Sequence, residues 1–471
     1  MRTSTGVASI VLSCLLLACG PGTIESGDGD GGASDGGTGA DACVGLACFQ
    51  VSCPGGGSTT LSGTVYAPNG TLPLYGVTVY VPNGPVDALP SGATCDRCGA
   101  PLSGNPLVSA TSNEAGQFTL ENVPATSAVP LVIQVGKWRR QIVVPAVAAC
   151  VDTALTADQA RLPRNKSEGD IPQMALTTGG ADSLECLLRK IGLDDAEFTN
   201  RSGTGRVHLF GGVDGTPRFA TTLNGGADFA NATTLWDTTP HLMPYDVTFL
   251  SCEGAQNPNT KPQTSLQALS DYTNVGGRVF ASHWHNYWIE AAPAPTLWPT
   301  TITPNHLGAL NSVRADINTG FPKGNSLATW LANVGGSPPG LTGKIDLTES
   351  KHTVEAVNPA TTERWISLAQ TANNRTSVQY YQFTTPLTVD DDQRCGKVVF
   401  SDIHVSAGDD SSAALRFPGG CTTTGLTPQE KVLAFMVFDI ASCVGPPIGR
   451  TDPDDGAASG AEAGDVPGRV D

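Results

Sequence analysis

The sequence predicts a multidomain protein in which an N-terminal antiparallel β-sandwich precedes a C-terminal α/β domain. Residues 58–150 show short alternating strands between Pro/Asn/Gly turns, and residues 180–445 alternate strands with amphipathic helices and contain a β-rich excursion. Residues 20–57, a flexible tether with a Cys-rich lead-in, and the acidic tail 446–471 are rich in Gly, Ser and Asp. Because such segments bury too little apolar surface to fold, we expect both ends of the chain to be disordered.

Residues 1–19 predict export from a bacterial cell. Their apolar run, VASIVLSCLLLA, is too short to cross a membrane as a stable helix and is typical of a signal peptide. The run leads into LLAC, which resembles a bacterial lipobox and implies that Cys19 is acylated and becomes the mature N-terminus. A plain signal peptide is the alternative. Because Gly20 and Pro21 supply no acidic retention residue, we expect a lipid-anchored outer-membrane protein that faces the periplasm or the cell surface.

The charge of the chain indicates which classes of partner to expect. The formal net charge is −17, and much of it lies in the tether and the tail. The part predicted to fold is only mildly acidic and has no basic stripe, so we expect no nucleic-acid partner. The expected partners are the membrane, through the lipid, and a carbohydrate or another component of the cell envelope.

Cysteine usage predicts disulfides. Of the 13 cysteines, removing Cys14 with the signal peptide and Cys19 with the lipid leaves eleven, an odd number, so at least one has no internal partner. We expect Cys443 to pair with Cys395 or Cys421. For the Cys95-Asp96-Arg97-Cys98 pair, we favour a bridge to Cys53 or Cys150, or a local staple, over a redox pair or half of a zinc site.

The strands of the first domain carry a resemblance. The segments SGTVYAPNG, PLYGVTVYV and TSNEAGQFTLENVP alternate apolar and polar residues, and VPLVIQVGKWRRQIVVP gives two strands hinged at Gly136. Together they resemble the carboxypeptidase regulatory-like domain, a transthyretin-like β-sandwich. That resemblance implies a domain without chemistry of its own. The stretch SGATCDRCGAPLSGNP is an insertion relative to that pattern.

The second domain carries a strand–helix–strand unit. YDVTFLSC (residues 245–252) and RVFAS (278–282) are predicted strands, separated by a helix in TSLQALSDYTNVGG (264–277). This spacing predicts a parallel, right-handed crossover, so both strands end at the same sheet edge, where sites of open α/β sheets lie. CGKVVFSDIHVS (395–406) is a third such strand.

Helices are marked by their caps and their apolar spacing. ADSLECLLRKIG is expected to begin at an Asp182 cap. TPQEKVLAFMVFDIASC is expected to begin with a capping box between Thr427 and Glu430 and to be buried on most sides. The excursion, residues 289–395, contains one further predicted helix and several antiparallel strands, and we assign no chemistry to it.

The order of these elements resembles a class I glutamine amidotransferase-like domain, most nearly of the trehalose-utilisation type. The resemblance implies a flavodoxin-like, mostly parallel sheet. It also implies an oxyanion loop after YDVTFL, a nucleophilic cysteine on a sharp elbow after RVFAS, and His-x-Glu after KVVFSDIH. The chain as a whole also resembles exported bacterial lipoproteins of unknown role.

The sequence departs from this family at each position that carries chemistry. The elbow has Ser282 and His283 in place of a Gly-flanked cysteine, and the last edge has Asp402 and His404 in place of His-x-Glu. Cys252 follows the neighbouring strand. We therefore expect a degenerate domain without amidotransferase activity.

Residues 281–288, ASHWHNYW, allow three interpretations. The first is a packed strand end with locally bonded histidines. The second is a divalent metal site, in which His283 and His285 face one side of a continuing strand and His404 joins them, with Asp402 or Glu253 to complete the set.

The third interpretation is a hydrolase or a carbohydrate-handling cleft. Ser282 or Cys252 would be the nucleophile, His283 or His404 the base, and Asp402 or Glu253 the orienting acid. The binding surface would comprise Glu253, Trp284, Tyr287 and Trp288. We favour a binding or structural role in the envelope, with the metal-dependent or Ser/Cys hydrolase as the alternative. These interpretations depend on whether Cys252, His283 and His404 converge.

Overall fold

The structure is a computed structural model that describes residues 43–307, 312–348, 350–368, 376–405 and 408–445. The chain separates into two units, Met1–Cys43 and Val44–Asp471, and the helices and strands of the described residues all lie in the second unit. The predicted signal peptide, lipobox, tether to residue 42 and acidic tail lie outside the described residues. In the part of the chain that is described, no helix combines the length and apolar character needed to cross a bilayer.

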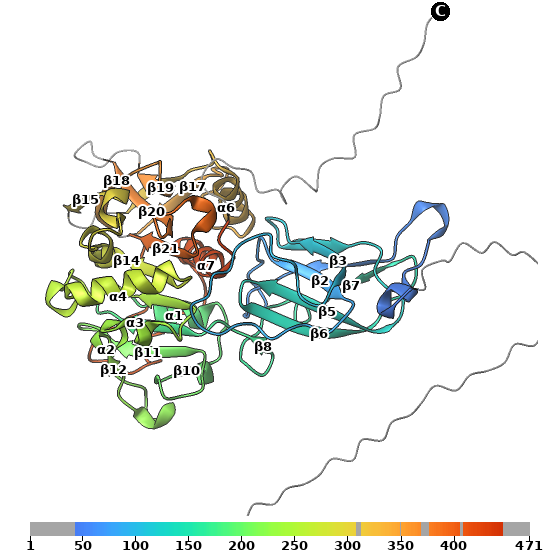
Figure 1. Ribbon diagram of the computed structural model, residues 1–471, viewed down its shortest axis with the longest axis horizontal. Helices are drawn as coiled ribbons and strands as arrows, with labels where there is room; N and C mark the ends of the chain where they lie inside the picture. Colours follow the sequence, from blue (N-terminus) through green and yellow to red (C-terminus); the bar gives the residue numbers. More distant parts are fainter. Residues whose placement is uncertain (1–42, 308–311, 349, 369–375, 406–407, 446–471) are drawn as a thin grey trace, which may run out of the picture. The chain divides into compact units, whose positions relative to one another are not determined.

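The region that the sequence predicts as the first domain forms two sheets (Figure 1). The smaller sheet has the order β4-β1-β7 and the larger has the order β3-β2-β5-β6-β8. Most pairings are antiparallel, but β1 and β7 pair in parallel, which the sequence did not suggest. Their bounds are β1 Thr60–Thr64, β2 Thr78–Pro82, β3 Pro106–Thr111, β4 Gln117–Leu120, β5 Ser127–Val135, β6 Trp138–Ala146, β7 Asp152–Ala154 and β8 Gly169–Asp170.

The predicted hinge at Gly136 is a turn between β5 and β6. Gly136 has φ +52°, in the left-handed region that glycine adopts without steric cost. A Cβ at this position would lie 1.6 Å from the carbonyl oxygen of Ala441. A glycine is therefore required both by the turn and by the close approach of the α7 helix (Pro428–Ala441).

The region that the sequence predicts as the second domain is built on one mixed sheet. Its order is β10-β11-β9-β13-β14-β21-β20-β19-β16-β17, with β12 paired to β11. Pairs from β10 to β21 are parallel, including the predicted β13–β14 pair, whereas β21 to β17 are antiparallel. The bounds are β9 Met174–Thr178, β10 Phe198–Thr199, β11 Val207–Gly211, β12 Ala230–Asn231, β13 Val247–Leu250, β14 Arg278–Ser282, β16 Val313–Ile317, β17 Lys344–Leu347, β19 Glu363–Leu368, β20 Ser377–Thr385 and β21 Gly396–Ser401.

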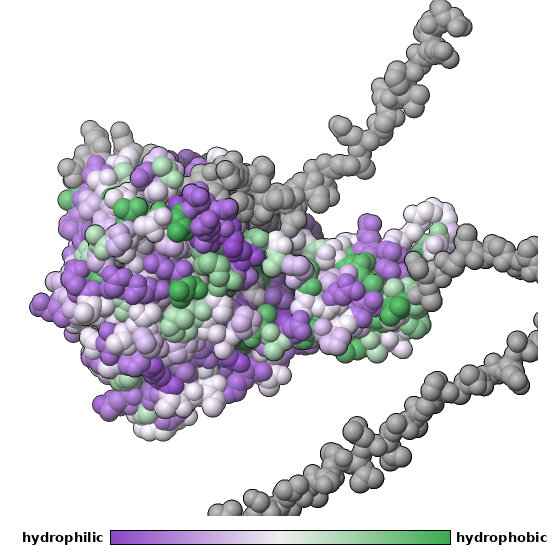
Figure 2. Space-filling view, in the orientation of Figure 1, coloured by the Kyte–Doolittle hydropathy of each residue, from purple (hydrophilic) through white to green (hydrophobic). Residues whose placement is uncertain are grey.

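The predicted excursion therefore extends the main sheet. Two of its strands, β15 (Ile302–Leu307) and β18 (His352–Val357), form a separate antiparallel pair. The molecule is a sheet-rich α/β protein with several sheets and few helices, which confirms the predicted class at this level. On the face drawn in Figure 2, hydrophilic and apolar residues are interspersed over the α/β elements.

Both faces of the parallel strands are buried. Phe249, Phe280 and Val399 belong to one apolar core, and their neighbours Leu250 and Ala281 belong to the other. Because side chains alternate along a strand, each strand serves both cores. α1 and α7 contribute to the first core and α4 to the second. The helices are α1 Leu184–Lys190, α2 Thr233–Trp236, α3 Thr239–Leu242, α4 Gln263–Asn274, α5 Tyr287–Glu290, α6 Pro322–Asn333 and α7 Pro428–Ala441.

The caps match the sequence in one helix and differ in another. The capping box of α7 is confirmed, since the Thr427 hydroxyl accepts from Glu430 N and the Glu430 carboxylate accepts from Thr427 N. The predicted Asp182 cap of α1 is wrong. Ser183 occupies the cap position, without a side-chain cap bond, and the Asp182 carboxylate bonds to other elements.

Ten cysteines are disulfide-bonded and Cys252 is free and buried, which confirms the prediction from the odd count for the described residues. Two expected pairings are wrong. Cys443 pairs with Cys98, and Cys95 pairs with Cys395, so the insertion in the first domain is joined to the second. The other bridges with described partners are Cys53–Cys150 and Cys186–Cys421.

A backbone contact explains why Cys98 reaches Cys443. Val444 N donates to Asp96 O at 2.9 Å, and Cys98 N donates to Val444 O at 3.1 Å. The insertion thus runs alongside the segment that follows α7. Closeness in the sequence does not predict this pairing, because the two cysteines are 345 residues apart.

Candidate functional site

The carboxyl ends of three adjacent parallel strands bring the predicted site residues together. Cys252 follows β13, His283 follows β14 and His404 follows β21. One potential ligand atom from each residue lies within 4.8 Å of the other two. Cys252 Sγ is 3.3 Å from His283 Nδ1, and the two histidine rings have centroids 5.1 Å apart. The three side chains on whose convergence the interpretations of the sequence depend therefore lie together.

The cluster is buried and neutral. Cys252 has no exposed surface, and His283 and His404 are each 7% exposed. Burial raises the pKa of the Cys252 thiol to about 12 and lowers the pKa of His283 to about 3. The pKa of His404 is also well below its usual range, mainly through burial. In this state the cluster is a thiol beside two uncharged imidazoles.

A strained turn positions His283. β14 ends at Ser282, and a short 3-10 helix, His283–Asn286, begins at once. His283 has φ +45°, a left-handed conformation that costs a residue with a side chain on the order of 1 kcal/mol. The chain therefore turns sharply from strand to helix here, and the turn presents an imidazole to Cys252.

One ring nitrogen of His404 lacks a partner in the part of the chain that the structure describes. Its ring is hydrogen-bonded to the backbone of Ala181. Its Nε2 atom is buried and has no hydrogen-bond partner among the described residues. An unsatisfied buried polar atom costs about 1–3 kcal/mol, so such an atom usually has a functional reason.

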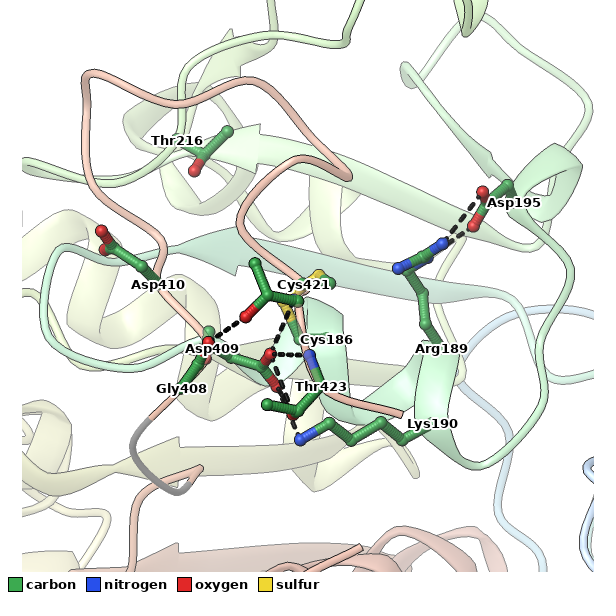
Figure 3. Close-up of a disulfide and its surroundings, with 12 residues drawn as sticks. Cys186, Arg189, Lys190, Asp195, Thr216, Gly408, Asp409, Asp410, Cys421 and Thr423 are labelled. Carbon is green, nitrogen blue, oxygen red and sulfur yellow. Dashed lines mark hydrogen bonds and ion pairs between the residues drawn. A yellow bond between two sulfur atoms is a disulfide. The ribbon is translucent and has the colours of Figure 1, made fainter. Parts of the chain in front are cut away.

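An ion pair and a disulfide join the segment after His404 to α1. Asp409 forms a 2.6 Å ion pair with Lys190 and accepts from Thr423 N at 3.0 Å. Figure 3 shows this ion pair beside the Cys186–Cys421 bridge, which links the same two segments. His404 is thereby held between a buried strand and a covalently closed loop.

Ser282 is not paired with a histidine. Its hydroxyl donates to Asp182 Oδ2 at 2.6 Å, and Asp182 Oδ1 accepts from Val405 N and Ser183 N, both at 2.9 Å. Burial raises the pKa of Asp182 to about 6. Asp182 thus joins the residue before one cluster histidine to the residue after the other. The sequence assigned Asp182 only to a helix cap, and nothing local in the sequence signals this role.

The two other predicted carboxylates, Asp402 and Glu253, bond to residues outside the cluster. Asp402 accepts from both Thr353 N and Thr353 Oγ1 at 2.8 Å, and burial raises its pKa to about 7. Glu253 forms a buried ion pair with Lys261 at 2.6 Å and accepts from Val213 N. Neither is placed to orient a histidine, so these residues do not assemble a nucleophile–base–acid triad.

His285 lies outside the cluster. Trp288 Nε1 donates to its Nδ1 at 2.9 Å, and its Nε2 then donates to Ser251 O at 2.9 Å. Both ring nitrogens are engaged, so the predicted metal set of His283, His285 and His404 gives way to one in which Cys252 replaces His285. The assumption of a continuing strand is wrong, because the chain turns at His283.

The predicted aromatic binding surface is smaller than expected. Trp288 is 1% exposed and packs on Trp236, with ring centroids 5.1 Å apart, so it belongs to a core. Trp284 and Tyr287 are half-buried. Of the predicted binding residues, these two retain exposed surface, whereas Glu253 is buried.

Comparison with known proteins gives no family. No family model matches the chain, and no curated protein matches it. Among solved structures, a ThuA-like protein from Bacteroides uniformis ATCC 8492 is 10% identical over 56% of this chain and 89% of its own, with a TM-score of 0.30. A cytoplasmic protein from Salmonella typhimurium LT2 is 11% identical over 57% and 97%, with a TM-score of 0.27. Likenesses this weak decide neither the fold nor the function of this chain.

Proposed function

We propose that this chain is an exported metal-binding protein whose centre consists of Cys252, His283 and His404. The observation that carries the proposal is the convergence of one sulfur and two nitrogen donors within 4.8 Å in a buried cluster. Sulfur and imidazole donors suit zinc and copper. Two such donors on one tetrahedral zinc lie about 3.5 Å apart, given Zn–S of about 2.3 Å and Zn–N of about 2.0 Å. The 3.3 Å separation of Cys252 Sγ and His283 Nδ1 matches that spacing.

The unpaired nitrogen of His404 favours a metal over a simple hydrogen bond between Cys252 and His283. A metal-bound histidine commonly has its second ring nitrogen bonded to a backbone carbonyl or a carboxylate, which fixes the ring. His404 has a backbone partner of this kind at Ala181 and a free buried Nε2. Coordination would satisfy that atom, whereas a dyad of Cys252 and His283 would leave it orphaned.

The metal interpretation is also favoured over hydrolysis. Ser282 donates to Asp182, and Cys252 has a histidine neighbour, but no acid among the described residues is hydrogen-bonded to that histidine. We therefore propose that the α/β domain is a degenerate amidotransferase-like domain in which His283 occupies the elbow. Binding, to the metal and to a component of the envelope, is then its role.

The proposed location is the outer membrane, with the chain anchored by lipid on Cys19. Support comes from the lipobox-like LLAC at the end of the signal sequence. Mass spectrometry of the N-terminal peptide from native protein tests this. A diacylated or triacylated peptide that begins at Cys19 is expected, and an unmodified peptide that begins elsewhere contradicts the proposal.

Metal analysis tests the proposed centre. The full chain, purified without chelator and reloaded separately with zinc and with copper, should retain about one ion per molecule, as a single cluster of one sulfur and two nitrogen donors implies. Cys252→Ser keeps the size of the side chain but loses the soft donor, and His404→Gln loses the nitrogen. Both should lose the ion. His241→Ala, at an exposed histidine paired with Asp237, is the control and should keep it.

One result would contradict the proposed metal centre. If the folded wild-type chain, as judged by circular dichroism, retains no more zinc or copper than Cys252→Ser, the cluster is a hydrogen-bonded dyad and the proposal fails.

A further inference from the structure

A chain of aromatic rings leads from the cluster to the protein surface. The His283 and His404 rings are 5.1 Å apart, His283 and Trp284 are 4.8 Å apart, and Trp284 and His306 are 5.9 Å apart, all measured between centroids. The side chain of His306 is 48% exposed. Trp284 therefore lies between a proposed metal ligand and a solvent-accessible ring.

The packing of Trp284 differs from that of the other tryptophans. The sequence has 7 tryptophans, and the remaining six, Trp138, Trp236, Trp288, Trp298, Trp330 and Trp365, are fully buried in the cores. Trp284 is half-buried, and its ring contacts are with His283 and His306. Core packing does not account for an indole at this position, whereas a link between the two imidazoles does.

The hydrogen bonds to the Cys252 sulfur also favour a redox-active metal. Gly254 N donates to Cys252 Sγ at 3.4 Å, and the backbone of Trp284 donates to the same sulfur. Hydrogen bonds to a metal-bound thiolate tune the reduction potential of the metal. Within the described residues the donor group contains three members, two histidines and one cysteine. That donor set is typical of copper sites that transfer electrons.

We propose that the centre binds copper and exchanges single electrons through Trp284 with a one-electron carrier that docks at His306. This inference rests on the proposed metal centre. In the oxidising step, Cu(I) loses one electron and becomes Cu(II), and the carrier gains that electron. No covalent bond forms or breaks in the protein, and Cys252, His283 and His404 stay bound in both states.

If electrons pass through Trp284, replacing it should slow the oxidation of the bound copper, whereas a purely structural role of Trp284 predicts no such change in rate. The chain is loaded with Cu(I) without oxygen and oxidised with hexacyanoferrate(III), and the thiolate-to-Cu(II) absorption is followed by stopped flow. Trp284→Leu should bind one copper and show the same absorption, but oxidise about tenfold more slowly, equivalent to about 1.4 kcal/mol in barrier. Trp284→Phe should restore most of the rate. Phe321→Leu, at a half-buried aromatic residue that packs on Trp365 outside the ring chain, is the matched control and should leave the rate unchanged.

The outcomes separate the two proposals. Equal rates in the wild type and in copper-loaded Trp284→Leu overturn the electron route but leave the metal centre intact. Retention of zinc with no stable copper also overturns the electron route alone. If no ion is retained, the proposed function fails and the electron route fails with it.

Discussion

Asp182 and Ser282 are joined by a 2.6 Å hydrogen bond between two buried side chains that lie 100 residues apart in the chain. The second carboxylate oxygen of Asp182 accepts from Val405 N. Ser282 precedes His283 and Val405 follows His404, so one carboxylate sets the spacing of the two cluster histidines. Asp182 touches neither ring in these bonds and is a positioning residue.

Replacing Asp182 with Asn should weaken metal binding. Asn keeps the size of the side chain, but it can keep both partners only if its amide nitrogen donates to Ser282 Oγ, which reverses that hydrogen bond and removes the charged acceptor that Ser282 and Val405 share. Loss of an outer-shell partner typically lowers metal affinity about 10–100-fold. Competition with a chromophoric chelator measures the affinity. Asp246→Asn, at a buried carboxylate paired with Lys137, is the control and should change stability without changing affinity. Equal affinities in Asp182→Asn and the wild type would show that the histidines are spaced by other contacts.

The two bridges between the insertion and the second domain should be major contributors to stability. Cys95–Cys395 and Cys98–Cys443 close separations of 300 and 345 residues. Removing a native disulfide of this kind typically costs about 2–5 kcal/mol, because the unfolded chain regains conformational freedom. We expect the double variant Cys95→Ala/Cys395→Ala to show this loss in urea unfolding. The Cys53–Cys150 double variant, whose bridge lies within the sandwich, is the comparison. A loss below about 0.5 kcal/mol would mean that noncovalent contacts hold the insertion in place.

Thiol titration should find one reactive cysteine per mature chain, and only after unfolding. Cys252 is the free cysteine of the described residues and is fully buried, whereas ten other cysteines are disulfide-bonded. Burial also raises its pKa to about 12, which keeps it in the unreactive thiol form. A thiol reagent should therefore give no signal with native protein and one equivalent in denaturant without reductant. Three or more equivalents would show that at least one of the bridges does not form.

The parts of the site that sequence alone could predict are those set by local pattern. Strand and helix periodicity placed Cys252, His283 and His404 at one sheet edge, because parallel strands joined by a helix end on the same side. The exclusion of His285 could not be predicted, since it depends on the left-handed turn at His283. The role of Asp182 could not be predicted either, because Ser282 and Val405, the two partners that it joins, lie 100 and 223 residues away in the chain.

The local sequence pattern also could not predict the disulfide pairing or the extension of the main sheet by the excursion. The pairing of Cys98 with Cys443 depends on two segments meeting across domains. The strands of the excursion were predicted as antiparallel, but their continuation from β21 through β20 depends on register between distant segments. Sequence periodicity reports which face of an element is apolar and does not report which element covers it.

The ion pair of Arg161 and Glu168 should make stability depend on pH. Both guanidinium nitrogens of Arg161 donate to the Glu168 carboxylate, at 2.5 and 2.7 Å, and Arg161 is 3% exposed. The Arg161 hydrogen bonds, opposed by partial burial, lower the pKa of Glu168 from 4.5 to about 2. Because the folded-state pKa is depressed, the stabilisation is complete above about pH 4.5 and is lost as the pH falls towards 2. Glu168→Gln should therefore be less stable than the wild type by about 2 kcal/mol at neutral pH. That difference should shrink towards zero near pH 2 in urea unfolding.

Asp158→Asn is the control. It removes the other carboxylate partner of Arg161, and because the Asp158 side chain is 72% exposed, the substitution should cost less than about 1 kcal/mol. A difference between Glu168→Gln and the wild type that stays constant across this pH range would show that the charge of Glu168 does not carry the effect.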